Sequence, residues 1–347
     1  MRPASEDEIK RWDELVSANP DGGDPLQGRA FAETKARFGW KPFYGLLTVG
    51  ESEVAVLHLI RNVSGLGELW YAPKGPGITA VGQFEKYIDL KRQHAGHAFL
   101  LKSEPQILKS AEAEAALRRQ KLVKARDIQF NQTATVLVDL KPSEDDIIAS
   151  FKQKARYNVR YAEKHGITVE VAESTEANWR QMYALMQATQ ARAGFYLRDY
   201  SYFETFWKEH AKRGSGQLFF AKLEDQVLAG VFAAFVGKKG LYKDGGSTRE
   251  HSNFQAPYLL QWEVMRWLKS KGIETYDLHG VPPADRLEDE THPLHSLVLF
   301  KTGFNAEVTE YIGTWDLPLS PAYGRWRKYG ERLAMIYSHR IKKQLFY

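Results

Sequence analysis

The chain of 347 residues contains no cysteine. This absence excludes disulfides, thiolate metal sites and a cysteine nucleophile, and it makes the cytoplasm the expected compartment. No apolar run approaches the roughly 20 residues needed to span a bilayer, and the acidic, polar N-terminus MRPASEDEIKRW lacks the apolar core of a signal peptide. A hydrophobic content of 43% is that of a soluble globular protein, and the length suits one large domain or two ordinary ones.

Common catalytic and cofactor motifs are missing too. The sequence has no Walker phosphate loop, no dinucleotide-binding fingerprint and no serine-nucleophile elbow. His292 and His295 lie beside the acidic segment 285–290, but such a loop is more often simply solvated, so we expect no metal site. Gly245-Gly246-Ser247 could turn the backbone toward a ligand, although a turn alone explains it. We expect no cofactor.

The positive charge is concentrated in two blocks. Residues 151–165 contain five lysines and arginines against one acid, and residues 323–347 contain seven against one. Such blocks favour an anionic partner, namely nucleic acid, a phosphorylated metabolite or a membrane surface, although each alone is also compatible with a solvated helix face. The second block also carries Trp326, Tyr329 and Tyr337, so it either contacts a membrane surface or packs as a core helix.

The two halves of the chain repeat one order of elements. Each has a helical lead-in, a meander of strands with tight turns, an amphipathic helix and a buried strand, and residues 46–60 align with residues 219–233. This pattern predicts an α/β (α+β) protein with two duplicated domains. We place them at 1–140 and 141–317, with a last strand at 307–312 and a C-terminal helix, 318–347, packing back on the first domain.

Local signals mark individual sites. Ser5 and Glu8 have the spacing of a capping box. Arg198 precedes Tyr202 by one helical turn, and an arginine beside an aromatic ring suits a phosphate and a stacked ring. A surface arginine over a half-buried tyrosine is an equally good interpretation. Lys301 follows Phe300 at a helix end, where most lysines are simply solvated.

Several motifs together resemble the Fem (FemABX) family of peptidoglycan aminoacyltransferases. They are YAPKGP at 71–76, FKQKARYNVRYAEKHG at 151–166, TQARAGF at 189–195, YDLHGV at 276–281 and LFKTGF at 299–304, together with the helix that carries Lys35. The resemblance covers nearly the whole chain and implies two tandem GNAT-like domains, each a twisted mixed sheet with flanking helices. The chain lacks a long heptad run, so it resembles the compact, arm-less alanyltransferase type that acts on UDP-MurNAc-pentapeptide. The acetyl-CoA pyrophosphate loop of ordinary GNAT enzymes is not visible in the second half.

The resemblance implies a catalytic role for Lys301. Its ammonium would stabilise the tetrahedral oxyanion formed at the ester of an aminoacyl-tRNA, a contact worth about 3 kcal/mol. The nucleophile would be the amine of a stem peptide, so no protein nucleophile is needed, and we identify no obligatory protein base.

The resemblance also implies substrate-binding residues. Lys35, Arg198 and Tyr202 would hold the nucleotide diphosphate and sugar of the precursor, and Tyr242 and Phe300 would line the substrate site. Asp244 stands where relatives tend to carry a second aromatic residue, which leaves the exact precursor open.

The expected partners are aminoacyl-tRNA and a UDP-MurNAc-pentapeptide or lipid-linked muropeptide, with the chain a monomer. The basic stretch would contact the tRNA acceptor stem, which is read mainly through its backbone; the residues are Lys152, Lys154, Arg156 and Arg160. Two alternatives remain: a GNAT-like N-acyltransferase with another acyl donor, and a non-enzymatic protein that binds RNA or an anionic polymer. The sequence leaves open the transferred amino acid, the accepting residue and the soluble or lipid-linked form of the acceptor.

Overall fold

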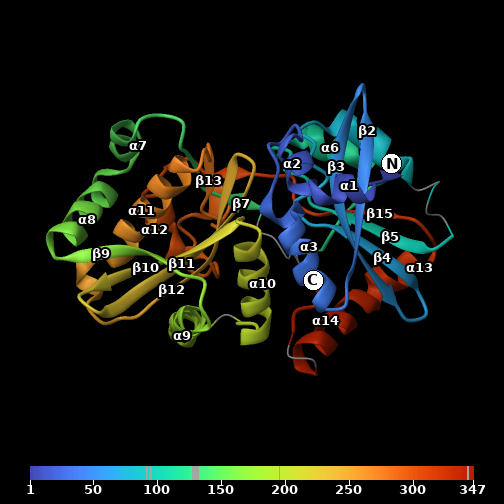
Figure 1. Cartoon of the computed structure of the whole chain (residues 1–347). Helices are drawn as coiled ribbons and strands as arrows, with labels where there is room; N and C mark the ends of the chain where they lie inside the picture. Colours follow the sequence, from blue (N-terminus) through green and yellow to red (C-terminus); the bar gives the residue numbers. More distant parts are fainter. Residues whose placement is uncertain (91–92, 94–95, 127–132, 195, 342–343) are drawn as a thin grey trace. The chain divides into compact units, whose positions relative to one another are not determined.

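The computed structural model describes residues 1–347 except 91–92, 94–95, 127–132, 195 and 342–343. The chain forms two compact units (Figure 1): unit 1 comprises Met1–Thr133 and Glu310–Tyr347, and unit 2 comprises Ala134–Thr309. These divisions lie seven to eight residues before the 140/141 and 317/318 boundaries drawn from the sequence. Strand pairing explains the difference, because β8 (Leu137–Asp139) pairs with β13 (Thr275–Asp277) of unit 2, whereas β15 (Trp315–Pro318) pairs with β5 (Ala98–Ser103) of unit 1.

Unit 1 is built on a seven-stranded mixed sheet in the order β1-β2-β3-β4-β5-β15-β6. Strands β4 and β5 are parallel, and every other printed pair is antiparallel. The remaining strands are β1 (Arg2–Pro3), β2 (Lys41–Val49), β3 (Ser52–Val63), β4 (Gly67–Ala72) and β6 (Val123–Lys124). The sheet buries a core of apolar side chains that includes Val56, Trp70, Leu101 and Trp315.

The helices of unit 1 come from both ends of the chain. They are α1 (Glu6–Lys10), α2 (Trp12–Ser17), η1 (Pro25–Gln27), α3 (Arg29–Arg37), η2 (Val81–Gln83), α4 (Phe84–Ile88), α6 (Ala111–Arg119), α13 (Ala322–Arg325), the π-turn η6 (Trp326–Gly330) and α14 (Glu331–Arg340). Lys342 and Lys343 of the basic tail lie outside the described residues.

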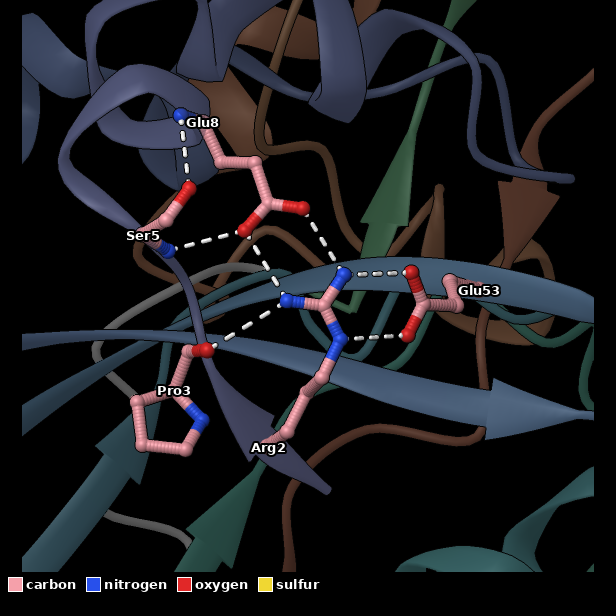
Figure 2. A network of polar contacts seen from close by, with 5 residues as sticks. All are labelled: Arg2, Pro3, Ser5, Glu8 and Glu53. Atoms are coloured by element: carbon pink, nitrogen blue, oxygen red, sulfur yellow. Dashed lines mark hydrogen bonds and ion pairs between the residues drawn. The ribbon is translucent and has the colours of Figure 1, made fainter.

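The N-terminus of unit 1 confirms the predicted capping box (Figure 2). Ser5 Oγ accepts from the Glu8 backbone N–H at 3.3 Å, and Glu8 Oε2 accepts from the Ser5 backbone N–H at 2.8 Å. Arg2 lies between Glu8 and Glu53 and donates to both carboxylates at 2.7–2.9 Å. The hydrogen bonds from Arg2 and Ser5 lower the pKa of Glu8 to about 2. This network joins the first helix to β3 of the sheet.

Unit 2 contains a six-stranded mixed sheet in the order β8-β13-β12-β11-β10-β9, in which β12 and β13 are parallel. Its further strands are β9 (Ile167–Ala172), β10 (Gly216–Leu223), β11 (Gln226–Val236) and β12 (Lys239–Ser247). Its helices are α7 (Glu144–Ser150), α8 (Gln153–Lys164), α9 (Glu176–Ala193), α10 (Tyr200–Lys212), η3 (Ser252–Phe254), α11 (Ala256–Ser270), η4 (Ala284–Arg286), η5 (His295–Leu297) and α12 (Val298–Lys301). Helices α8 and α11 pack together and bury an apolar core with β10 and β11.

The two sheets share a pattern of pairing. In each, an antiparallel meander leads into one parallel pair, β4 with β5 and β12 with β13. The hairpins close with the same geometry, Val49 opposite Ser52 and Leu223 opposite Gln226. By this geometry Val49 corresponds to Leu223. This correspondence differs by one residue from the alignment of 46–60 with 219–233.

The last predicted strand is wrong in extent. Instead of one strand over 307–312, the chain forms β14 (Thr309–Glu310), which pairs with β7 (Ala134–Thr135), and then β15. Strand β15 is inserted between β5 and β6 and so completes the sheet of unit 1. The pairing joins segments about 200 residues apart, which no local pattern can specify.

The predicted α/β class without a coiled-coil arm is confirmed for the described residues. Their longest helix is α9, with 18 residues. None of the described helices combines the length and apolar composition that a bilayer span requires.

Candidate functional site

Lys301 is a buried cation at the end of the short helix α12. Its side chain is 5% exposed, and Nζ donates to the backbone carbonyls of His279 at 2.6 Å and Gly280 at 2.9 Å. Burial lowers the pKa of Lys301 from 10.5 to about 7, against the opposing attraction of Asp277. Among the described residues its hydrogen-bond partners are carbonyls and no carboxylate. Lys301 is therefore buried, unlike most lysines at helix ends, which are solvated.

The carbonyls that hold Lys301 are themselves fixed by Asp277. This fully buried residue ends β13, and its Oδ1 accepts from the His279 backbone N–H at 2.7 Å and from the Thr135 hydroxyl. His279 adopts a left-handed backbone conformation, φ +56°, which turns the chain sharply after the strand. Asp277 therefore positions an acceptor of Lys301 as well as ending the strand.

A cavity of about 420 Å³ opens beside Lys301 within unit 2. Tyr242 and Phe300 line it together with Lys301, so three of the residues predicted from the sequence come together. The ammonium of Lys301 lies 5.6 Å from the centre of the Tyr242 ring. Other lining residues come from α9, β11, β12, α11 and η5; they include Thr189, Gly230, Lys243, Gln261 and Ser296.

Tyr242 is held neutral at the wall of this cavity. Burial and the nearby Asp244 raise the pKa of its hydroxyl to about 12, and a hydrogen bond with Gln261 opposes the rise. Gln261 also accepts a hydrogen bond from the Tyr276 hydroxyl at 3.0 Å. The cavity thus presents an uncharged phenol beside a titratable amine.

Gly245 and Gly246 do not form the turn suggested by the sequence; they lie within β12. A Cβ on Gly245 would lie 1.9 Å from the Tyr242 hydroxyl oxygen, and one on Gly246 would lie 2.5 Å from the backbone of Leu185 on α9. Glycine is required because the strand, Tyr242 and α9 are packed too closely for any side chain. Both glycines line the cavity and leave its wall open.

Asp244 is explained by its neighbours. Its Oδ2 accepts from the Trp207 indole N–H at 2.9 Å, and its Oδ1 pairs with Lys243 Nζ at 2.8 Å. Relatives tend to carry an aromatic residue at this position. In this chain Asp244 instead anchors α10 to β12 through the Trp207 indole. Sequence proximity could have suggested the pairing with Lys243, but not the contact with Trp207.

Arg198 and Tyr202 form the predicted arginine–aromatic pair. The Arg198 guanidinium lies 4.2 Å from the centre of the Tyr202 ring, and both side chains are buried. Tyr183 donates a hydrogen bond to the Arg198 backbone carbonyl at 2.9 Å, which fixes the segment before α10. Phe195, the last residue of the TQARAGF segment, lies outside the described residues.

Lys35 belongs to unit 1 and is described there alone. It lies on α3, is 2% exposed, and its ammonium is 5.2 Å from the centre of the Phe31 ring. A buried lysine at this point is unusual for a purely structural helix face. Its joint action with Arg198 and Tyr202 on one substrate remains a prediction.

The four basic residues assigned to tRNA have different surroundings. Lys152 Nζ donates to Thr302 Oγ1 at 3.3 Å, next to Lys301 in sequence. Arg156 donates to the backbone carbonyls of Ala149 and Phe151, so it also caps the end of α7. Lys154 lies 5.3 Å from the centre of the Tyr157 ring, and Arg160 is exposed.

An aromatic row that sequence reasoning missed runs along the same helix. Tyr157, Tyr161 and His165 follow at four-residue spacing with ring centres 5.6 and 3.9 Å apart. His165 stacks on Phe254 at 5.4 Å, and Phe254 stacks on His251 at 5.6 Å. The helical part of the row could have been found from the spacing, whereas its continuation through η3 depends on the fold.

Three cavities of unit 2 lie near this row, and two of them share lining residues. A hollow of about 520 Å³ on α8 is lined by Arg156, Tyr157, Arg160, Tyr161, Lys164 and His165, with Gln153. A second, of about 280 Å³, begins at His251 and reaches Phe300. It shares Ser247, Pro257, Ser296 and Phe300 with the Lys301 cavity. The stacked rings of His165, Phe254 and His251 connect the first hollow to the second, and the second joins the Lys301 cavity.

The loop with His292 and His295 is stabilised by its own side chains. Asp289 accepts from Arg286 and Thr291, hydrogen bonds that lower its pKa to about 2. His292 Nδ1 accepts from the Leu294 backbone N–H at 3.1 Å. Within the described ranges, no three histidine, cysteine or acidic residues gather as a metal site would require.

Comparison with known proteins places this site in a family. The FemAB family model matches residues 124–224 and 209–327. The lipid II:glycine glycyltransferase of Staphylococcus saprophyticus is 25% identical over 390 residues, covering 90% of this chain and 92% of its own length. The enzyme of that name from Staphylococcus aureus is 24% identical, covering 90% and 92%.

Solved structures show the same fold. The crystal structure of FemX has a TM-score of 0.82 at 20% identity and covers 95% of this chain and 100% of its own. A tandem GNAT protein from the clavulanic acid biosynthesis pathway has a TM-score of 0.50 at 12% identity and covers 92% and 98%. These likenesses confirm the GNAT-like fold, and because the family model matches more than half of the chain, this chain belongs to the FemAB family.

Proposed function

We propose that this chain is an aminoacyl-tRNA-dependent N-acyltransferase that adds an amino acid to the stem-peptide amine of a peptidoglycan precursor, as in the building of an interpeptide bridge. Membership of the FemAB family and the glycyltransferase names of its relatives support this class of reaction. The precursor is UDP-MurNAc-pentapeptide or its lipid-linked form. The single observation that carries the proposal is the environment of Lys301.

The surroundings of Lys301 suit a developing negative charge. Two carbonyls orient the ammonium, and no carboxylate among the described residues neutralises it by direct contact. Because the site is buried, an interaction with an oxyanion is stronger there than in water. Phe300 and Tyr242 supply the apolar wall of the cavity around it.

The transfer needs one bond made and one broken. The neutral stem-peptide amine attacks the ester carbonyl of the aminoacyl-tRNA, and the oxyanion of the tetrahedral intermediate lies against the Lys301 ammonium. The C–N bond forms, the C–O bond to the terminal ribose breaks, and the proton lost by the amine passes to the ribose oxygen directly or through water. No oxidant, metal or protein nucleophile takes part in this scheme.

The pKa of Lys301 sets a limit on the pH of activity. With a pKa of about 7, the ammonium is the major form below neutrality and is lost as pH rises. The acceptor amine, in contrast, becomes nucleophilic only as it loses its proton. The transfer rate should therefore pass through a maximum near neutral pH.

We further propose that the unpaired 3′ end of the tRNA follows the stacked rings and the cavities at either end of them in unit 2. Cations on α8 would bind its phosphates, and the exposed faces at the ends of the aromatic row, Tyr157 and His251, would stack on its bases. The terminal aminoacyl ester then reaches Lys301 past Phe300. Arg198 with Tyr202, and Lys35 in unit 1, would bind the diphosphate and sugar of the acceptor.

A transfer assay tests the function. Purified protein is incubated with a mixed pool of charged tRNAs and with UDP-MurNAc-pentapeptide or lipid-linked muropeptide, and the product is identified by mass. We expect a mass increase of one amino-acid residue that disappears when ribonuclease is added before the protein. Transfer that survives ribonuclease points to another acyl donor, and RNA binding without any product points to the non-enzymatic alternative; either result contradicts the proposal.

A pair of variants tests the RNA route in the same assay. Arg160→Gln on the exposed side of α8 should weaken the binding of tRNA. We expect the KM for aminoacyl-tRNA to rise severalfold with little change in kcat. Arg180→Gln is the matched control, since Arg180 is an exposed arginine of α9 paired with Glu176. Equal effects of the two variants would contradict the route.

A further inference from the structure

The final helix α14 presents apolar side chains to solvent. Leu333 is 63% exposed, Ile336 41% and Tyr337 53%, and the neighbouring Tyr329 and Ile341 are exposed to a similar degree. At 100° per residue these positions fall on one side of the helix, together with Arg340. The arrangement reverses the usual one, in which the apolar side of a surface helix faces the core.

The opposite side of the helix is fixed to unit 1. Glu331 and Ser338 are buried there, and Glu331 pairs with Lys102 at 3.2 Å and accepts from the Tyr347 hydroxyl at 2.5 Å. Trp326, one turn earlier, is 1% exposed and packs against Phe99. These contacts hold the helix in register, so the apolar side cannot turn inward without breaking a buried ion pair.

The charge around the apolar side has a single sign. The segment 320–341 contains five lysines and arginines and one acid, Glu331, whose carboxylate points into the unit. Arg332 and Arg340 are exposed and have no ion-pair partner among the described residues. A partner for this surface must therefore accept apolar side chains at its centre and carry negative charge at its rim.

We propose that α14 binds the surface of an anionic lipid membrane, with Leu333, Ile336 and Tyr337 inserted among the acyl chains. An interfacial helix combines just such features, namely an apolar side, tyrosines at the headgroup level and cations that reach the lipid phosphates. RNA would satisfy the cations but not the aliphatic centre of the surface. An apolar protein partner would satisfy the aliphatic centre and leave the cations unused.

Vesicle binding tests this surface without using the transfer reaction, so its result is independent of the proposed function. The full chain is mixed with phosphatidylglycerol-containing vesicles or with neutral phosphatidylcholine vesicles, and bound protein is measured by sedimentation. We expect binding to the anionic vesicles, weakened on going from about 0.1 M to about 1 M salt. Arg332→Gln with Arg340→Gln should weaken it roughly 10-fold or more, at about 1 kcal/mol for each cation.

The apolar contribution is tested by Leu333→Glu combined with Ile336→Glu, which should abolish most vesicle binding. Leu108→Glu is the matched control, because Leu108 is an isolated leucine of unit 1 that is 65% exposed. Thermal unfolding checks that each variant folds. The proposal is overturned if the wild-type chain ignores anionic vesicles, if the double variant binds like Leu108→Glu, or if the substitutions instead abolish self-association or RNA binding.

Discussion

Each unit of the molecule contains a buried lysine whose ammonium has polar partners, Lys102 in unit 1 and Lys301 in unit 2, and the two settings are opposites. The Lys102 ammonium in unit 1 lies 2.9 Å from a carboxylate oxygen of Asp316 and 3.2 Å from one of Glu331. The hydroxyls of Tyr323 and Tyr347 donate to the same two carboxylates. Lys301 in unit 2 donates to two backbone carbonyls and, among the described residues, to no carboxylate. Two carboxylates of the protein compensate the charge of Lys102, whereas no carboxylate among the described residues contacts Lys301 directly. The charge of Lys301 is therefore available to an anionic group of a substrate.

The pKa values follow from these settings. Burial alone would lower the pKa of Lys102, but the two carboxylates outweigh it and hold its pKa above the usual value. For Lys301 burial prevails, because Asp277 opposes it only in part. The comparison teaches that burial of a lysine does not identify a functional site; the partners of the ammonium do.

The largest expected effect is on stability and comes from Lys102. Lys102→Met leaves two carboxylates buried without their cation, so the free energy of unfolding should fall by about 3–5 kcal/mol in urea denaturation. Lys238→Met, which breaks an exposed pair with Glu274, should change it by about 0.5 kcal/mol or less. A loss as small as that of the control would mean that Lys102 is not the centre of a stabilising network.

The next effect concerns the pH dependence of stability. The pKa of Lys301 is lower in the folded than in the unfolded chain, so the unfolded state binds more protons between pH 7 and the ordinary lysine pKa of about 10.5. Stability should rise with pH across this window by up to about 1.4 kcal/mol per unit, and the rise from this group should vanish in Lys301→Met. Urea denaturation of both proteins at several pH values measures it. Identical slopes would contradict a depressed pKa.

A smaller effect is expected at Asp277. Asp277→Asn keeps an acceptor for the His279 backbone N–H but removes the charge that raises the pKa of Lys301. The alkaline side of the pH–rate profile should shift to lower pH, and transfer at pH 7 should fall about 5-fold for a shift of one unit, because the protonated fraction of Lys301 falls from about one half to about one tenth. A loss of rate with no shift of the profile would instead indicate a purely structural role for this carboxylate.

A further prediction concerns the glycines of the cavity wall. Gly246→Ala places a methyl group against the α9 backbone, and we expect a loss of about 1–3 kcal/mol in unfolding free energy with reduced transfer. Gly82→Ala is the control, since a Cβ there meets nothing within 4 Å. Equal stability of the two variants would contradict the close packing described for β12.

Local signals in the sequence predicted local structure well. The capping box at Ser5 and Glu8, the hairpins of the two halves and the adjacency of Arg198 and Tyr202 each depend on residues a few positions apart. Tyr242, Phe300 and Lys301, which the family resemblance implies as site residues, line one cavity, and their roles stay predictions. No physical rule applied to the sequence alone would have joined them.

What could not be predicted depends on contacts between distant segments. The insertion of β15 beside β5, the indole contact of Asp244 and the support of Lys301 by the Asp277 turn each join residues that are far apart in the chain. The pKa of Lys301 depends on the same packing, because burial is a property of the folded unit. A lysine next to a phenylalanine looks the same in sequence whether it is solvated or buried.

The most direct test of the comparison is the single-turnover transfer rate of Lys301→Met, measured alongside its urea midpoint. If Lys301 supplies the oxyanion contact, the rate should fall by about 10²–10³-fold, while the midpoint is no lower than that of the wild-type chain. A rate within a few-fold of the wild type, or a loss of rate that accompanies unfolding, would contradict the catalytic role assigned to this lysine.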